Sequence, residues 1–160
     1  MERPLISILV CMLKSREGSY RENLYPVLKK QIDTSNGNAE IKEFCDNGEL
    51  LIGTKRNSLL DLAAGEYCCF VDDDDMISAD YVSEILSSIE RNKYPDCVEI
   101  RGEIFWAKQW IEFRHSIKYC GWYTNDGIFF RTPNHLNPIR REIAQEVRFK
   151  NMGAGKWNVL

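Results

Sequence analysis

One stretch of the chain decides its fold: Tyr67-Cys68-Cys69-Phe70-Val71-Asp72-Asp73-Asp74-Asp75. A short apolar run between polar segments is typical of a strand that is buried on both faces. Four carboxylates follow this strand without interruption. In open α/β sheets, ligands bind at the carboxyl ends of the strands. The stretch therefore predicts a buried strand that carries acidic side chains to a ligand-binding edge.

Strand and helix patterns alternate around this stretch. Apolar runs at 5–13 and 39–45 predict two more strands, and apolar residues recur with helical spacing in 24–32, 59–64 and 81–89. Such alternation is typical of right-handed crossover connections. The expected fold class is α/β, a mainly parallel sheet covered by helices on both faces.

Local signals set the expected boundaries of these elements. Ser19 and Glu22 have the spacing of a capping box, and Pro26 predicts that the first helix is kinked or begins late. Thr54 is the expected N-cap of the second helix. Residues 97–100 are expected to form another strand.

The last third of the chain has a different composition. Aromatic residues crowd together beyond Gly102, and Asn125-Asp126-Gly127 is a hairpin-turn signal. We expect antiparallel strands here, attached to the parallel sheet. No linker or internal repeat interrupts the chain, so residues 1–160 are expected to form a single domain.

Composition and charge exclude several classes of protein. Apolar residues make up 44% of the chain and charged residues 28%, which predicts a folded protein. The formal net charge is −3. Because no basic stripe offsets the acids, we expect no nucleic-acid partner.

The cysteines and the apolar segments indicate the compartment. Six cysteines include no C-x-x-C pair, and Cys11, Cys68 and Cys69 lie in apolar runs, so buried thiols are favoured over disulfides or a zinc site. No segment reaches the roughly 20 apolar residues of a membrane span. Lys14-Ser15-Arg16 follows the N-terminal apolar run in place of a cleavage site. We expect a cytoplasmic protein without an integral membrane segment, and the oligomeric state is not predicted.

The acidic run Asp72 to Asp75 favours a metal site. Adjacent carboxylates repel one another, and a hard divalent cation such as Mg²⁺ or Mn²⁺ relieves that repulsion and bridges to phosphate. The alternative is an acidic loop that caps the next helix. The position directly after a buried strand favours the metal.

Cations and a further acid lie on the same predicted edge. Gly53-Thr54-Lys55-Arg56-Asn57 places two cations in the first helical turn, which suits a bound phosphate. The alternative, that Lys55 and Arg56 point into solvent, is equally supported by this segment alone. Lys14 and Arg16 follow the first strand, and Asp46 follows the second, where it either accepts a hydrogen bond from a nucleotide or only forms a turn.

Taken in order, these segments resemble the family 2 glycosyltransferases, a likeness that covers nearly the whole chain. The matching segments are Ile6-Ser7-Ile8-Leu9-Val10, Lys55-Arg56-Asn57, Ala63-Ala64-Gly65-Glu66-Tyr67, Phe70-Val71-Asp72-Asp73-Asp74-Asp75, and His135 to Ala144, which is similar to bacterial and phage members. The resemblance implies a GT-A fold. It also implies a hexosyltransferase-like, inverting, metal-dependent transfer from a nucleotide-diphosphate sugar, usually a UDP-sugar, to a saccharide acceptor.

The resemblance also implies roles for single residues. The aspartate after the second strand, Asp46, contacts the base; the D-x-D carboxylates contact the ribose and the Mn²⁺ or Mg²⁺ on the diphosphate. Residues 1–101 would form the nucleotide-binding half and 102–160 an incomplete acceptor-side half. The predicted nucleotide-sugar-binding residues are Lys14, Arg16, Asp46, Lys55, Arg56, Asn57, Asp72 and Asp73. The predicted metal ligands are Asp74, Asp75 and His135, although His135 is equally plausible as a simple loop residue.

The chain departs from this family at the catalytic base. Family members carry the base in an acidic motif soon after the segment that matches 147–149, whereas no acid follows Glu146 here. The chain is also short for a complete GT-A domain. The catalytic base is therefore unassigned, with Asp126, Glu142 and Glu146 as possible substitutes, and a non-catalytic or degenerate nucleotide-sugar-binding domain is the alternative.

A third class of function is a Mg²⁺-dependent nucleotidyltransferase or phosphatase. The nucleotidyltransferase would need a glycine-rich phosphate loop after the first strand, where only Gly18 occurs. The phosphatase would need Thr or Val after its aspartates, where Met76 stands. Both are disfavoured.

Overall fold

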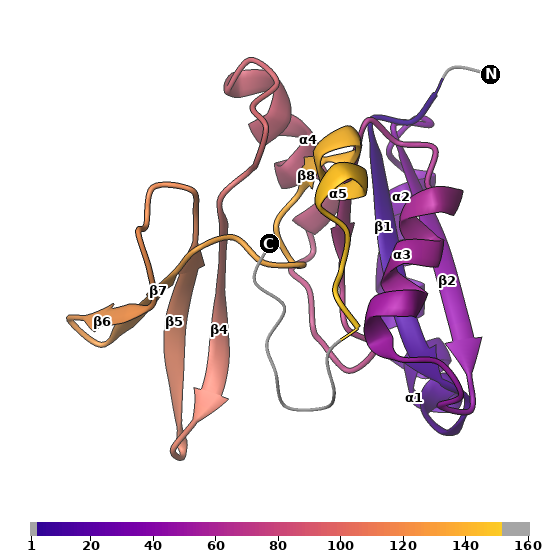
Figure 1. Ribbon diagram of the computed structural model, residues 1–160, viewed down its shortest axis with the longest axis horizontal. Helices are drawn as coiled ribbons and strands as arrows, with labels where there is room; N and C mark the ends of the chain where they lie inside the picture. The colour runs from indigo at the N-terminus through magenta and orange to yellow at the C-terminus, as the bar shows by residue number, and fades with distance from the viewer. Residues whose placement is uncertain (1–2, 152–160) are drawn as a thin grey trace.

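The computed structural model describes residues 3–151, which form two four-stranded sheets (Figure 1). Sheet A contains β1 (Ile6–Leu13), β2 (Ala39–Asp46), β3 (Tyr67–Phe70) and β8 (Ile139–Arg140) in the order β2-β1-β3-β8. β1 runs parallel to both β2 and β3, and β8 runs antiparallel to β3. The predicted α/β fold class with a mainly parallel sheet is confirmed.

Helices cover both faces of sheet A, as the continuous apolar run of β1 predicts. The helices are α1 (Glu17–Glu22), α2 (Leu24–Asp33), α3 (Ile52–Leu62), α4 (Tyr81–Arg91) and α5 (Arg141–Val147). Alternate β1 residues, such as Ile8 and Val10, enter a core with α2 and α4. Leu9 and Cys11 enter a second core with α3 and α5. Because successive strand residues point to opposite faces, a strand covered on both sides is apolar throughout.

Two predicted helix starts are wrong. Ser19 lies inside α1, and the helical ladder is interrupted at Asn23. Pro26 explains the interruption, since it lacks an N–H and its ring excludes the carbonyl four residues earlier. Thr54 is the third residue of α3, and Leu51 occupies the N-cap position.

Sheet B holds the aromatic-rich part of the chain. It contains β4 (Ile100–Trp106), β5 (Gln109–His115), β6 (Tyr123–Asn125) and β7 (Ile128–Arg131) in the order β4-β5-β7-β6. The expected antiparallel strands are present, with one parallel pair, β5 and β7. The predicted hairpin turn joins β6 and β7, with positive φ at Asp126 (48°) and Gly127 (76°). These angles are typical of the turn that Asp-Gly sequences favour.

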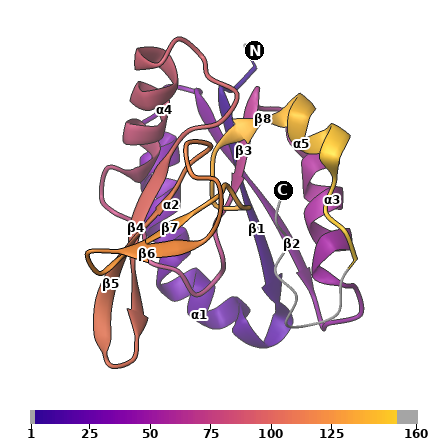
Figure 2. The same cartoon turned by 60° about the vertical axis from the view of Figure 1, so that its left-hand side comes forward.

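The chain passes from sheet A to sheet B earlier than predicted. The strand expected at 97–100 is reduced to an isolated bridge from Cys97 to Ile139, and β4 starts at Ile100 in the other sheet. Figure 2 shows the long β4–β5 hairpin extending away from sheet A. Asn137 joins the two regions, because its buried amide nitrogen donates to the carbonyls of Val98 (2.9 Å) and His115 (3.0 Å).

In the part of the chain that the structure describes, the longest helices are α3 and α4, with 11 residues each. No helix there has the length and hydrophobicity needed to cross a bilayer.

Candidate functional site

The carboxyl ends of β1, β2 and β3 meet at one edge of sheet A. In the parallel register, Leu13 at the end of β1 lies opposite Asp46 at the end of β2. β3 pairs with β1 from the other side and continues into Asp72. The topology therefore brings the predicted cations of α3, the residues after β1 and the acidic run to the same edge.

Asp46 and Lys55 form a buried ion pair at this edge. Lys55 Nζ lies 2.7 Å from Asp46 Oδ1, and the two side chains are 6% and 10% exposed. Asp46 also accepts hydrogen bonds from the backbone N–H groups of Gly48 (3.2 Å) and Leu50 (3.0 Å). The Lys55 hydrogen bond and these N–H groups lower the pKa of Asp46. Asp46 is thus ionised, and its hydrogen bonds fix the conformation of the loop that leads into α3.

Arg56 lies between two aromatic rings. Its guanidinium carbon is 5.5 Å from the centre of the Phe70 ring and 5.4 Å from that of Phe149. Arg56 Nη2 reaches Asp72 Oδ1 at 3.4 Å, and Arg56 Nε is buried with no hydrogen-bond partner in the described part of the chain. Lys55 and Arg56 are only 5% and 7% exposed, so the solvent-facing alternative is wrong.

Asp72 lies between Arg56 and His135. His135 Nε2 is 3.3 Å from Asp72 Oδ2. Burial acts to raise the pKa of Asp72, but the hydrogen bond and charge of His135, together with Arg56, lower it to about 2. Asp72 is therefore ionised throughout the physiological range, and His135 is held at the acidic run although 63 residues separate them in sequence.

Arg16 joins the end of β1 to the acidic run. Its Nη2 lies 2.7 Å from Asp73 Oδ1 and its Nη1 lies 3.0 Å from Asp74 Oδ2. The Asp73 side chain is 1% exposed, whereas that of Asp74 is 67% exposed. Burial raises the pKa of Asp73, and Arg16 opposes that shift. Neither oxygen of Asp73 has a hydrogen bond of good geometry within residues 3–151.

Asp75 closes a tight turn with Asp72. The Asp75 N–H donates to the Asp72 carbonyl at 3.0 Å, and the Asp72 N–H donates to Asp75 Oδ2 at 3.3 Å. Although the residue is exposed as a whole, burial of its carboxyl group and then the charge of Asp72 raise the pKa of Asp75 to about 6. Solvent reaches Asp74 and Asp75, which are exposed residues, and also part of Asp72, whose side chain is 45% exposed.

Two predicted residues have other contacts. Lys14 is 63% exposed and pairs with Glu17 on α1. The Asn57 amide is engaged on both sides by Phe149, donating to its carbonyl (3.0 Å) and accepting from its N–H (2.9 Å). Asn57 thereby fixes the segment after α5, which presents the Phe149 ring to Arg56.

No protein-family model matches this chain, and no curated protein sequence matches it. The chain shares its fold with S. aureus TarS. A crystal structure of TarS 1–349 in complex with UDP-GlcNAc aligns with a TM-score of 0.54 and 14% identity, over 91% of this chain and 48% of TarS 1–349.

A second crystal structure of S. aureus TarS 1–349 gives a TM-score of 0.52 and 16% identity, over 91% of this chain and 50% of the other. This chain therefore spans about half the length of the TarS chain that it matches. At these identities the likeness to TarS is one of fold.

The acidic run fits one mode of metal binding and not another. Within residues 3–151, no three His, Cys, Asp or Glu side chains are grouped to hold a metal ion by themselves. Mg²⁺ and Mn²⁺ in nucleotide sites, however, need only one or two carboxylates, with phosphate and water as the other ligands. Asp74 and Asp75, which are both exposed residues, provide two carboxylates for that mode. His135, the third predicted ligand, contacts Asp72 instead.

The possible substitutes for the catalytic base lie on other elements. Asp126 occupies the turn between β6 and β7. Glu142 lies next to Arg141, and the Arg141 N–H donates a hydrogen bond to the Glu66 carbonyl at the start of β3. Asp72 follows the other end of β3. Glu146 is exposed near the end of α5. The catalytic base stays unassigned.

The two aromatic rings that contact Arg56 were not predicted from the sequence. Phe70 lies within a predicted strand, but only the fold brings Phe149 to it, with ring centres 5.3 Å apart and an edge-to-face angle of 84°. An apolar residue in a polar C-terminal segment was the only signal for Phe149.

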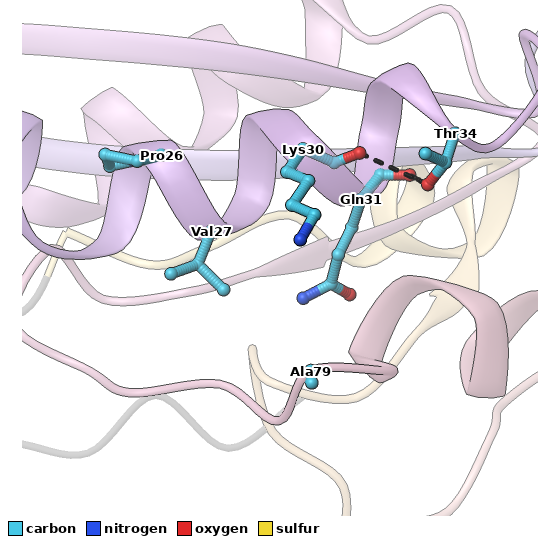
Figure 3. Close-up of a pocket in the computed structure, with 6 residues that line it drawn as sticks. All are labelled: Pro26, Val27, Lys30, Gln31, Thr34 and Ala79. Carbon is cyan, nitrogen blue, oxygen red and sulfur yellow. Dashed lines mark hydrogen bonds between the residues drawn. The ribbon is translucent and has the colours of Figure 1, made fainter.

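A hollow elsewhere on the surface takes no part in this site. It has a volume of about 410 Å³ and lies between α2 and the segment before α4 (Figure 3). Its lining residues are Pro26, Val27, Lys30, Gln31, Thr34 and Ala79. Gln31 has a structural role there, because its amide donates to the Ser78 carbonyl and accepts from the Val82 N–H, both at 2.9 Å.

Proposed function

We propose that this chain binds a nucleotide-diphosphate sugar, with a UDP-sugar as the favoured donor, and transfers the sugar to a saccharide acceptor. The observation that carries the proposal is Arg56, a buried guanidinium at the carboxyl edge of a parallel sheet whose Nε has no partner in the described chain. A buried donor without a partner is costly unless a ligand supplies the acceptor. The fold likeness to TarS, crystallised with UDP-GlcNAc, supports the same ligand class.

The charges at this edge divide into two groups. Asp46 and Lys55 neutralise each other in a buried pair, and they set the shape of the loop before α3. Arg16, Arg56 and His135 face the acidic run. The positive charge of the two arginines is available to a diphosphate, because guanidinium groups bind phosphate oxygens through paired N–H donors.

A divalent cation, Mn²⁺ or Mg²⁺, would be held by Asp74 and Asp75 together with the diphosphate. When bound, it would supply positive charge that stabilises the leaving diphosphate. Arg16 shares this region, since its Nη1 lies 3.0 Å from Asp74. We propose that donor binding draws Arg16 from Asp74 toward phosphate, while Asp73 keeps its buried ion pair with Arg16.

In an inverting transfer, the acceptor hydroxyl oxygen forms a bond to the anomeric carbon while the bond from that carbon to the diphosphate oxygen breaks. The electron pair leaves with the nucleoside diphosphate, and the hydroxyl proton passes to a base. Asp126 lies in the turn between β6 and β7, and Glu142 lies at the start of α5, beside the start of β3 and not beside its acidic end. The placement of these two acids favours a second proposal, that the chain binds the donor without turning it over.

Calorimetric titration with UDP, GDP and UDP-GlcNAc, with and without Mn²⁺, tests both proposals. We expect UDP to bind in the presence of Mn²⁺, with at least about a tenfold loss of affinity in Asp74→Asn, since a metal-binding carboxylate is removed. Trp110→Ala is the matched control, because Trp110 is exposed on β5 in the other sheet.

Hydrolysis or transfer of the UDP-GlcNAc sugar separates the two proposals. Metal-dependent binding with turnover supports the transferase, and binding without turnover supports the donor-binding domain. If neither UDP nor GDP binds in the presence of Mn²⁺, both are refuted. The expected cytoplasmic location stays a prediction, which localisation of the tagged full chain would test.

A further inference from the structure

Sheet B carries a second hollow, which is lined by four aromatic residues and two polar ones. It has a volume of about 170 Å³ and lies on the β6–β7 hairpin and the residue before it. Its lining residues are Trp122, Tyr123, Thr124, Phe129, Phe130 and Arg131. Trp122 and Tyr123 are 46% and 49% exposed. Exposed rings with two hydroxyl groups and one cation among them are typical of a binding site rather than of a core.

Arg131 gives this cleft its charge. The guanidinium carbon lies 4.5 Å from the centre of the Trp122 ring and 5.6 Å from that of Phe129. No carboxylate of the described chain forms an ion pair with Arg131, and burial lowers its pKa. The other arginines of sheet B are paired, Arg101 with Glu99 (3.0 Å) and Arg114 with Glu112 (2.6 Å). Arg131 is therefore a partly desolvated cation whose anionic partner is left to a ligand.

The cleft is linked to the acidic run through the chain. β7 ends at Arg131, and His135, which contacts Asp72, follows four residues later. Four residues span at most about 14 Å, so the two Cα atoms are within the length of a short oligosaccharide. A ligand in the cleft can thus extend toward the edge of sheet A where the donor is proposed to bind.

We propose that the Trp122–Arg131 cleft binds a saccharide that carries a negatively charged group, as the acceptor of the transfer reaction. The aromatic rings would contact the apolar face of the sugar, the Thr124 hydroxyl would bond a sugar hydroxyl, and Arg131 would pair with the phosphate or carboxylate. The role as acceptor site rests on the proposed function, whereas binding to the cleft does not.

Titration of the full chain with glucose 6-phosphate, followed by NMR of the Trp122 indole N–H, tests this inference. Trp122→Phe assigns the resonance, and saturating UDP with Mn²⁺ blocks the proposed donor site. We expect glucose 6-phosphate to shift the Trp122 signal, and we expect Arg131→Gln to weaken binding by about tenfold or more, because a charge-assisted hydrogen bond is lost. Arg101→Gln, at a paired and exposed arginine of the same sheet, should leave the affinity unchanged.

Glucose and inorganic phosphate complete the test. Both should bind at least about tenfold more weakly than glucose 6-phosphate, since each lacks one part of the recognised group. Equal binding of inorganic phosphate would overturn the sugar part of the inference, and equal binding of glucose would overturn the anionic part. An unmoved Trp122 signal, or full affinity in Arg131→Gln, would overturn both. Failure of UDP to bind would refute the proposed function alone, because the cleft is measured separately.

Discussion

Arg16 and Asp73 form an ion pair, with Nη2 2.7 Å from Oδ1, that ties the end of β1 to the acidic run after β3. Only Arg16 reaches solvent, since the Asp73 side chain is 1% exposed and that of Arg16 is 47% exposed. The pair explains how four consecutive carboxylates coexist in the folded chain. Arg56 contacts Asp72, and Arg16 contacts both Asp73 and Asp74.

Arg16→Gln is expected to destabilise the protein, because it leaves Asp73 buried without a counter-charge. Breaking such a partly exposed pair costs about 1–3 kcal/mol in the free energy of unfolding. Urea unfolding at pH 7 measures the loss. Lys14→Gln is the control, since the exposed Lys14 should change stability by less than about 0.5 kcal/mol.

The loss of stability caused by Arg16→Gln should depend on pH. The folded-state pKa of Asp73 is raised, so the folded state binds a proton more tightly than the unfolded state does. Stability contributed by this group is present at low pH and is lost as pH rises through the folded pKa. The penalty of Arg16→Gln should therefore shrink from pH 7 to pH 4. An equal penalty at both values would show that Asp73 is not the group left unpaired.

Gly65→Ala is expected to be strongly destabilising. A Cβ at Gly65 would lie 2.6 Å from the Ser7 nitrogen and 2.7 Å from the Tyr67 oxygen, both backbone atoms that cannot move aside. The expected loss is about 2–4 kcal/mol in the free energy of unfolding, from overpacking between two paired strands. Thermal and urea unfolding give the value.

Gly18→Ala is the matched substitution, because a Cβ at Gly18 in α1 has open space around it. Alanine should stabilise the helix there by about 0.5–1 kcal/mol, since glycine loses more backbone entropy on folding. If both substitutions destabilised equally, the close approach at Gly65 would not be the cause.

His115 should make the protein sensitive to mild acid. The residue is 2% exposed, it packs 4.7 Å from the Phe113 ring, and neither ring nitrogen has a hydrogen bond of good geometry within residues 3–151. Burial lowers its pKa to about 4. Between the unfolded pKa of about 6.5 and this value, only the unfolded state takes up the proton, so stability falls as pH falls.

His115→Phe removes that titration. From pH 7 to pH 4.5, wild type should lose about 1–3 kcal/mol more stability than the variant does, whatever constant packing change Phe introduces. Parallel urea unfolding curves across this range provide the measurement. Identical pH profiles for the two proteins would show that His115 titrates normally in the folded state.

The thiols are expected to fall into two classes. Cys45 and Cys120 are exposed, whereas burial raises the pKa to about 12 for each of the other four, Cys11, Cys68, Cys69 and Cys97. The thiolate is the reactive form, so only the exposed pair should react quickly with Ellman's reagent at pH 8. The remaining four should react on unfolding in urea. Three or more fast thiols in the native protein would contradict this assignment.

Much of sheet A could be predicted because its signals are local. The apolar run of β1, the placement of the acids directly after β3 and the Asp126-Gly127 turn are set by residues a few positions apart. A continuous apolar run indicates that a strand is covered on both faces, but it does not show which elements cover it. For that reason the fold class was predicted correctly, while the start of β4 in a second sheet was not.

The sequence by itself determined which elements form and which residues follow the strands, since strand burial and chain order place Asp46 and Asp72 to Asp75 on one edge. Only the tertiary structure decided the partners. Arg16 contacts the acidic run, Asn57 bonds to Phe149 across 92 residues, and Arg131 has no carboxylate partner within residues 3–151. The physical reason is that charge pairing depends on distances in space, and long-range packing fixes those distances where local periodicity cannot.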